Sequence, residues 1–235
     1  MLIFTLEIVA RLGGLKPGRN SFGGFLHLQF CMNNLMTILQ TLDRFDKWLF
    51  QKINGQWTNP LFDSVFPFLR QSNVWMPLYL FLFVFVVLNF KKNSWWWVVF
   101  FICTVALTDL TGTNVFKHSF ERLRPCRDPA FASSVRLIIK ECAGGSSFIS
   151  NHAANHFGLA TFLYFTLRHY FPKWIWIAYL WAAAISYSQV YVGVHYPLDV
   201  ICGALLGIIF GLFTAMFFNK KFGFVNFDTQ PTVTH

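Results

Sequence analysis

Long apolar runs separated by short polar segments dominate the chain from residue 71 onward. A transmembrane helix needs about 20 mainly apolar residues. Runs that hold at most one Asp, Glu, Lys or Arg predict five spans: residues 71–90, 93–116, about 150–167, 174–198 and 200–219, the last entered from about His195. The pattern therefore predicts an all-α fold, a polytopic membrane helical bundle with about five transmembrane helices.

The first 70 residues follow a weaker pattern. Residues 1–36 combine a short apolar stretch with several glycines, which break helices, so we expect a poorly defined N-terminal extension. In residues 37–70 aromatic and aliphatic positions alternate with charged ones, which predicts amphipathic helices lying in the membrane interface. Residues 71–219 then form the transmembrane domain, and residues 220–235 a cytoplasmic tail.

The composition agrees with a membrane protein. Of the 235 residues, 55% are hydrophobic and only 12% charged, whereas soluble domains carry about 25% charged residues. The net charge is +9, but the sequence has neither a long basic run nor a nucleic-acid-binding motif, so no nucleic-acid partner is expected. A basic protein of this kind suits anionic lipid surfaces and anionic substrates.

Three polar segments at the ends of the spans carry the candidate chemistry: residues 117–125, 149–152 and 188–199. Charged residues are rare within membrane-spanning sequence and usually have a functional role there. Because successive spans alternate in direction, the three segments share one side of the membrane. The opposite side carries six basic residues near span ends, which predicts that it is cytoplasmic: Lys91, Lys92, Arg168, Lys173, Lys220 and Lys221.

The first two segments are suited to binding a phosphate. Lys117 offers a point charge and Arg124 a bidentate fork. Ser150 adds a hydroxyl, and Asn151 begins the third span, where free helical N–H groups and the helix dipole favour an anion. Either cation alone would be explained by contact with lipid headgroups. Together, beside the other polar segments, they predict a phosphate site.

The third segment is suited to nucleophilic attack. His195 and Asp199 are four residues apart at the start of the fifth span, so they lie on one helical face. A carboxylate that accepts one ring N–H leaves the other nitrogen free as a nucleophile or base. His152, at the start of the third span, can protonate the leaving oxygen. A lone interfacial histidine is more often structural, but two histidines with an aspartate and nearby cations favour catalysis.

These segments resemble the motifs of the phosphatidic acid phosphatase type 2 superfamily, which includes lipid phosphatases and vanadium haloperoxidases. The family pattern is K-x6-R-P, P-S-G-H and S-R-x5-H-x3-D. Lys117 to Pro125 matches the first motif fully. The second reads Ile-Ser-Asn-His, and in the third Gln189 replaces Arg. The resemblance covers about residues 70–218.

The resemblance implies a bacterial membrane phosphatase that needs neither metal nor cofactor. By it, His195 is the nucleophile and forms a phosphohistidine, Asp199 orients it, and His152 protonates the leaving group. The phosphate is held by the remaining motif residues: Lys117, Arg124, Ser150, the N–H of Asn151, and Gln189. The implied substrate is a lipid phosphate or diphosphate, such as undecaprenyl diphosphate, phosphatidylglycerophosphate, phosphatidic acid or lipid A. The implied location is the inner membrane, with the site facing the periplasm.

Two departures from the motifs affect this interpretation. Gln189 has no charge, and a charge-assisted hydrogen bond is about twice as strong as a neutral one. We therefore expect weaker phosphate binding unless another residue takes over: Arg122, Arg127 or His156. Asn151 in place of Gly adds a side chain near the phosphate, which either clashes with it or donates to it.

Cys126 and Cys142 bracket the loop between the first two polar segments. If the loop is extracytoplasmic, a disulfide can form and would contribute about 3 kcal/mol on a loop-entropy model. Two free thiols are the alternative. The chain has no CxxC pair, so the cysteines do not indicate a zinc or thioredoxin-like site.

Two other functions remain as alternatives. An intramembrane metalloprotease would use His152 and His156, spaced four apart, with Asp199 as third ligand. The HExxH motif of such enzymes requires Glu at the second position, where this chain has Ala153, and the cations would stay unexplained. A non-catalytic lipid-binding relative of the phosphatases is supported only by the two departures from the motifs.

Overall fold

The computed structural model describes residues 21–90 and 93–224, and within this range the chain is helical with no strand. Three short 3₁₀ turns, η2, η5 and η6, span Ser72–Trp75, Pro125–Arg127 and Ala132–Ser134. The longer helices follow in chain order: α2 (Ser21–Gln51), the π-helix η1 (Lys52–Gln56), α3 (Pro60–Leu69), α4 (Met76–Phe90), α5 (Ser94–Leu110), the π-helix η4 (Thr111–Lys117), α6 (Asn151–Leu167), α7 (Ile177–Tyr191) and α8 (Pro197–Lys221).

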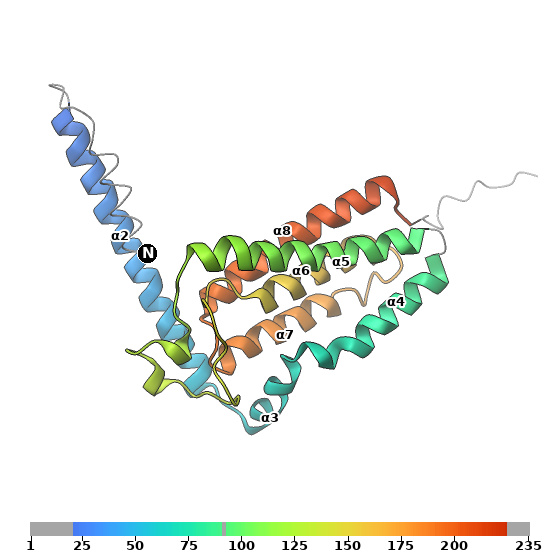
Figure 1. Cartoon of the computed structure of the whole chain (residues 1–235), viewed down its shortest axis with the longest axis horizontal. Coiled ribbons are helices and arrows are strands. Elements are labelled where there is room, and N and C mark those ends of the chain that lie inside the picture. Colours follow the sequence, from blue (N-terminus) through green and yellow to red (C-terminus); the bar gives the residue numbers. More distant parts are fainter. Residues whose placement is uncertain (1–20, 91–92, 225–235) are drawn as a thin grey trace, which may run out of the picture.

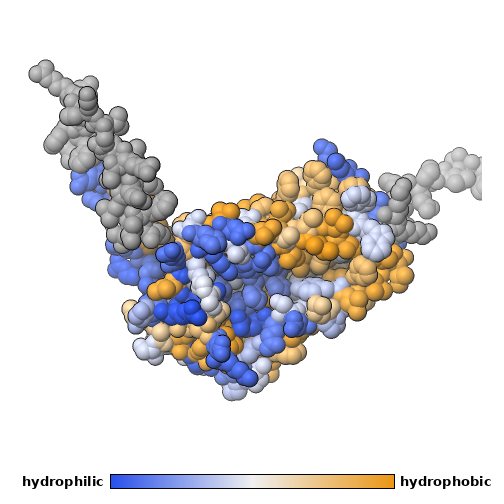
Figure 2. Space-filling model, viewed as in Figure 1, coloured by the Kyte–Doolittle hydropathy of each residue, from blue (hydrophilic) through white to orange (hydrophobic). Residues whose placement is uncertain are grey.

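Helices α4 to α8 form a bundle (Figure 1), and the part of it that lies away from α2 is largely apolar on the face that Figure 2 shows. Three helical segments are long and apolar enough to cross a membrane: Ser72–Phe90, Ser94–Lys117 and α8. Large apolar side chains on them are exposed, among them Leu88 (73%) and Ile209 (62%). Water would not favour such a surface, but lipid tails would cover it. The predicted all-α membrane bundle is therefore confirmed, and the chain is an integral membrane protein.

Helices α6 and α8 pack side by side through the centre of the bundle (Figure 1). Their backbones approach closely because α8 turns glycines toward α6: a Cβ atom on Gly207 would overlap the backbone oxygen of Ala154. The backbone N–H of Ser150 also donates to the backbone oxygen of Asp199 at 3.0 Å. The first turns of the two helices therefore lie together, and with them the second and third polar segments.

The segment of residues 21–70, here called the N-terminal cap, meets the end of the bundle that carries the polar segments, while the N-terminal part of α2 extends away from the bundle (Figure 1). Helix α2 is continuous through residue 36, where the sequence led us to expect a boundary. Phe66 of α3 stacks edge-on against Tyr191 of α7, with ring centroids 4.9 Å apart. The buried Asn54 of η1 donates to the backbone oxygens of Arg136 (2.9 Å) and Tyr191 (2.8 Å). Residues 1–20 and 225–235, which include most of the expected tail, lie outside the described residues.

Candidate active site

The three polar segments meet where the loop between α5 and α6 crosses the start of α8 (Figure 1). Each segment contributes a side chain from the end of a helix: Lys117 is the last residue of η4, Ser150 caps α6, and His195 lies just before α8. Arg124 immediately precedes the 3₁₀ turn η5. Helix ends place side chains at the polar edge of a membrane bundle while the helices themselves remain buried or in lipid. The predicted residues, which are far apart in sequence, are brought together in this way.

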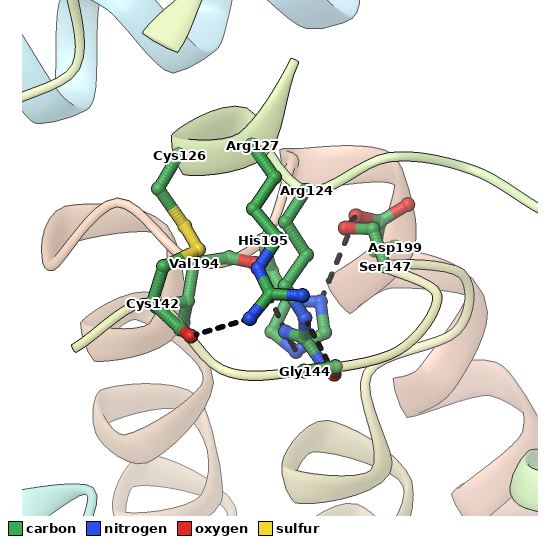
Figure 3. Close-up of a disulfide and its surroundings, with 9 residues drawn as sticks. All are labelled: Arg124, Cys126, Arg127, Cys142, Gly144, Ser147, Val194, His195 and Asp199. Atoms are coloured by element: carbon green, nitrogen blue, oxygen red, sulfur yellow. Dashed lines mark hydrogen bonds and ion pairs between the residues drawn. A yellow bond between two sulfur atoms is a disulfide. The ribbon is translucent and has the colours of Figure 1, made fainter.

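His195 and Arg124 form the centre of the cluster (Figure 3). The guanidinium Nη1 of Arg124 lies 3.0 Å from Nε2 of His195, and it also donates to the backbone oxygen of Val194 at 3.1 Å. His195 is only 4% exposed. Burial lowers its pKa, although the Asp199 carboxylate acts in the opposite direction. The imidazole is therefore neutral at neutral pH, with an available lone pair on the nitrogen that faces the arginine.

Asp199 lies close to His195, but His195 precedes α8, so the two do not share a helical face as the four-residue spacing led us to expect. The distance from His195 Nδ1 to Asp199 Oδ2 is 3.7 Å, which is longer than a hydrogen bond, and Nδ1 has no hydrogen-bond partner. Other donors hold the carboxylate: the backbone N–H of Tyr196 at 2.9 Å and the hydroxyl of Ser147. The first of these is part of the N-terminal capping box of α8.

Arg122 also holds Asp199, and the sequence analysis had not assigned it this role. Its Nη1 donates to Asp199 at 2.6 Å, and its Nη2 donates to Asp46 of α2 at 2.6 Å. Asp46 in turn accepts the backbone N–H of Leu198 at 2.8 Å. Burial alone would lower the pKa of Arg122, but the two carboxylates raise it above the ordinary value. Arg122 is therefore a fixed, charged link between the N-terminal cap and the start of α8.

Gln189 approaches an arginine that lies outside all three motifs. Its side chain is fully buried, and its Oε1 accepts from Nε and Nη2 of Arg70, both at 3.4 Å. Nε2 of Gln189 has no hydrogen-bond partner. Arg70 immediately follows α3 in the N-terminal cap. Nothing in the local sequence around Arg70 indicates this contact.

None of the three residues expected to compensate for Gln189 faces it. Arg122 is held by its carboxylates, and Arg127 donates to the backbone oxygen of Cys142 at 3.3 Å (Figure 3). His156 packs against Trp181 with ring centroids 4.8 Å apart, and its Nδ1 lies 2.7 Å from the His152 backbone oxygen. Each of these side chains therefore contacts other groups, and none of the three forms a hydrogen bond with Gln189 in the described part of the chain.

Asn151 turns its side chain toward α5. Its Nδ2 donates to Asp109 Oδ1 and to Thr113 Oγ1, both at 2.8 Å. Gly112 leaves room for it, since a Cβ atom there would lie 2.7 Å from Asn151 Oδ1. Ser150 caps α6 by accepting the backbone N–H of Ala153 at 3.4 Å. Asn151 is thus accommodated as a link between α5 and α6.

The loop over the site is anchored at two points (Figure 3). Cys126 and Cys142 form a disulfide with Cα atoms 6.0 Å apart. The backbone oxygen of Gly144 then accepts Nε of Arg124 at 3.2 Å. Because Arg124 is held by this loop and by Val194, its guanidinium is fixed before any ligand arrives.

Lys117 and His152 border the same cluster. Lys117 is half-buried and lies close enough to Arg124 and His195 for their charges to interact. His152, in the first turn of α6, lies close enough to His195 and Arg70 for charges on these side chains to interact. Within the described residues no group of three or more His, Cys, Asp and Glu side chains is arranged to hold a metal ion. The arrangement is thus one of cations and imidazoles around a neutral His195.

A helical membrane bundle with these residues gathered at one polar end defines a membrane phosphatase of the PAP2 type. Residues 94–222, more than half of the chain, match the PAP2 superfamily, and the chain belongs to this superfamily. The resemblance that the three motifs predicted is confirmed.

Relatives and solved structures agree with this assignment. The chain is 32% identical to a lipid A 4'-phosphatase of Porphyromonas gingivalis over 167 residues. This aligned region covers 70% of this chain and 69% of that protein. It is 31% identical over 173 residues to a lipid A 4'-phosphatase of Bacteroides thetaiotaomicron, with 72% and 75% covered. The crystal structure of Aquifex aeolicus LpxE is similar, with a TM-score of 0.56, 30% identity, and 72% of this chain and 93% of that chain covered.

Proposed function

We propose that this protein hydrolyses a phosphate ester of a membrane lipid and that the 4'-phosphate of lipid A is its first candidate substrate. The observation that carries the proposal is the buried, neutral His195, whose Nε2 faces the Arg124 guanidinium at 3.0 Å. An anion bound by that guanidinium would lie next to the nucleophilic nitrogen. The likeness to two lipid A 4'-phosphatases supports lipid A over the other lipid phosphates.

In the proposed reaction, Nε2 of His195 attacks the phosphorus atom and the bond from phosphorus to the lipid oxygen breaks. His152 gives a proton to that oxygen, so the lipid leaves as an alcohol. Water then attacks the phosphohistidine, with His152 accepting a proton, and orthophosphate is released. Covalent catalysis of this kind divides one difficult displacement into two easier ones.

The charged residues around His195 support both steps. Lys117, Arg124 and the N-terminus of α6 would neutralise the charge on the transferring phosphoryl group. As His195 forms a bond to phosphorus its ring becomes cationic, and Asp199, 3.7 Å from Nδ1, would stabilise that charge. No step requires a metal ion. The positive-inside pattern supports a site on the periplasmic face of a bacterial inner membrane.

The test is phosphate release by purified protein in detergent with EDTA present. The panel comprises lipid A, undecaprenyl diphosphate, phosphatidylglycerophosphate and phosphatidic acid. We expect EDTA-resistant release, fastest from lipid A, that His195→Ala abolishes. His169→Ala is the matched control, because His169 follows α6 at the opposite end of that helix.

Three results would contradict the proposal. Release that EDTA removes would indicate a metal-dependent reaction, and release that survives His195→Ala would exclude His195 as nucleophile. No release from any of the four lipids by folded protein would favour the non-catalytic alternative. An acid-labile phosphorylated protein that appears with wild type and not with His195→Ala would support the covalent intermediate.

A further inference from the structure

Arg70 is a half-buried cation without a carboxylate partner among the described residues. Its guanidinium donates two hydrogen bonds of 3.4 Å to Gln189 Oε1. Arg122 and Arg136, by contrast, pair with Asp199 and Asp63 at 2.6 and 2.8 Å. Burial lowers the pKa of Arg70, and no nearby carboxylate offsets that effect. Burying a guanidinium away from water without a counter-ion costs free energy, unless a ligand supplies the negative charge.

The neighbours of Arg70 add to this excess of positive charge. Arg70 and Arg124 are close enough to repel each other, and Arg124 contacts only backbone oxygens and His195. The carboxylate nearest His195 is that of Asp199, which Arg122 already neutralises. An anion between Arg70 and Arg124 would relieve their repulsion and would lie beside the His195 ring.

Gln189 is suited to positioning Arg70. Its Oε1 accepts from the guanidinium, whereas an arginine at position 189 would repel it. Its Nε2, fully buried and without a partner, remains available to donate to an anion. A cavity of about 400 Å³, whose lining includes Arg70 and the oppositely charged Lys140 and Glu141, opens beside Arg70. Arg70 is therefore within reach of a ligand.

We propose that Arg70 is a phosphate-binding residue of this active site and that Gln189 positions its guanidinium. The cation that the third motif lacks is thus supplied by the N-terminal cap, from a residue 119 positions away in sequence. This inference rests on the proposed function, since it deepens the description of the same site. Arg70 and Gln189 form a complementary pair that replaces a single motif arginine.

The test uses three variants of the full-length protein: Arg70→Gln, Gln189→Arg, and the double variant. Orthophosphate binding is measured by calorimetry in detergent, and kcat and KM are measured on the lipid that the wild type hydrolyses. Because a hydrogen bond to a charged group contributes about 1.5–3 kcal/mol, we expect Arg70→Gln to weaken orthophosphate binding roughly ten- to hundredfold. The double variant should recover most of this loss, since it restores one arginine. Arg168→Gln, at the opposite end of α6, is the matched control and should bind as wild type does.

The outcomes separate this inference from the proposed function. Weaker orthophosphate binding by Arg70→Gln, with recovery in the double variant, would support the inference. If these binding results appeared while no lipid was hydrolysed, the proposed function alone would fail. Arg70→Gln that lowers the melting temperature but keeps wild-type orthophosphate affinity would show a purely structural residue and would overturn the inference. Wild-type protein that binds no orthophosphate, or a double variant that recovers nothing, would overturn it as well.

Discussion

The transmembrane bundle and the N-terminal cap contribute to one site in different ways. The bundle and its loop carry the motif residues, which lie at helix ends and are held by contacts within the bundle and its loop, as Arg124 is by the backbone oxygens of Gly144 and Val194. The cap carries no motif, yet Asp46 fixes Arg122 and Arg70 reaches Gln189. A site residue in the bundle therefore has a recognisable sequence context, and one in the cap does not.

The two regions also differ in what stabilises them. The bundle is held by close helix contacts such as that of Gly207 with α6, and lipid would cover its apolar outer surface. The cap is attached by polar contacts, among them those of the buried Asn54 and a partly exposed ion pair in which Arg136 Nη1 donates to both carboxylate oxygens of Asp63. We infer that substitutions in the bundle segments mainly affect chemistry, whereas those in the cap affect stability and chemistry together.

The largest expected effect comes from the motif side. Arg124→Ala removes the guanidinium beside His195 Nε2, and we expect kcat/KM to fall about 10²–10³-fold because a fixed donor to the transferring group is lost. Stability should change little by comparison. Lipid phosphatase assays and thermal unfolding check the two halves of this expectation.

The control for Arg124→Ala is Arg127→Ala, because Arg127 belongs to the same loop and its side chain, within the described residues, donates a hydrogen bond to the Cys142 backbone oxygen alone. Its activity should stay near that of wild type. Equal losses in both variants would mean that the loop, and not the Arg124 guanidinium, is responsible.

A smaller effect is expected from the cap. Asn54→Ala leaves the buried backbone oxygens of Tyr191 and Arg136 without their donor, so the free energy of unfolding should fall by about 1–3 kcal/mol. Activity should fall with it, because the cap also carries Arg70 and Asp46. Chemical denaturation in detergent measures the first effect and the lipid assay the second.

Asn34→Ala, at an exposed position of α2, is the matched control and should leave both quantities unchanged. If Asn54→Ala lowered stability but kept full activity, the cap would be a structural cover with no part in positioning the site.

The smallest effect is a shift in pH dependence. His195 reacts in its neutral form, and burial lowers its pKa below the ordinary value of 6.5. We therefore expect kcat/KM to stay constant as the pH falls through 6.5 and to decline only at lower pH. Asp199 raises the pKa of His195, so in Asp199→Asn the decline of kcat/KM should move to still lower pH. The kcat/KM of this variant should also be much lower than that of the wild type at every pH. Rate profiles of both proteins on one substrate check this.

Comparing the two profiles matters because a phosphate monoester itself titrates at about pH 6. That titration is common to both proteins, so the difference between their profiles reports His195. A decline that begins above pH 6.5 in the wild type, or that moves upward in Asp199→Asn, would contradict the expected environment of His195.

The sequence predicted most of the bundle and part of the site. The spans follow from composition, which is a local property of the chain. The proximity of His195 to Asp199, with 3.7 Å between Nδ1 and Oδ2, arises in the turn that precedes α8 and not from spacing along a helix. The fate of Asn151 was open: the sequence allowed a clash or a donor to phosphate, and the structure turns the side chain to Asp109 because Gly112 leaves space. That outcome depends on the packing of α5 against α6.

By itself, then, the sequence determined the membrane bundle, the three motif segments and the side of the membrane that they share, because a bilayer requires apolar runs and a helix fixes spacing within a few residues. Only the tertiary structure decided that Asp46 links to Arg122 and that Arg70 faces Gln189. Each of these contacts joins the N-terminal cap to distant positions. It depends on how α2 and α3 fold over the end of the bundle, which no local pattern specifies.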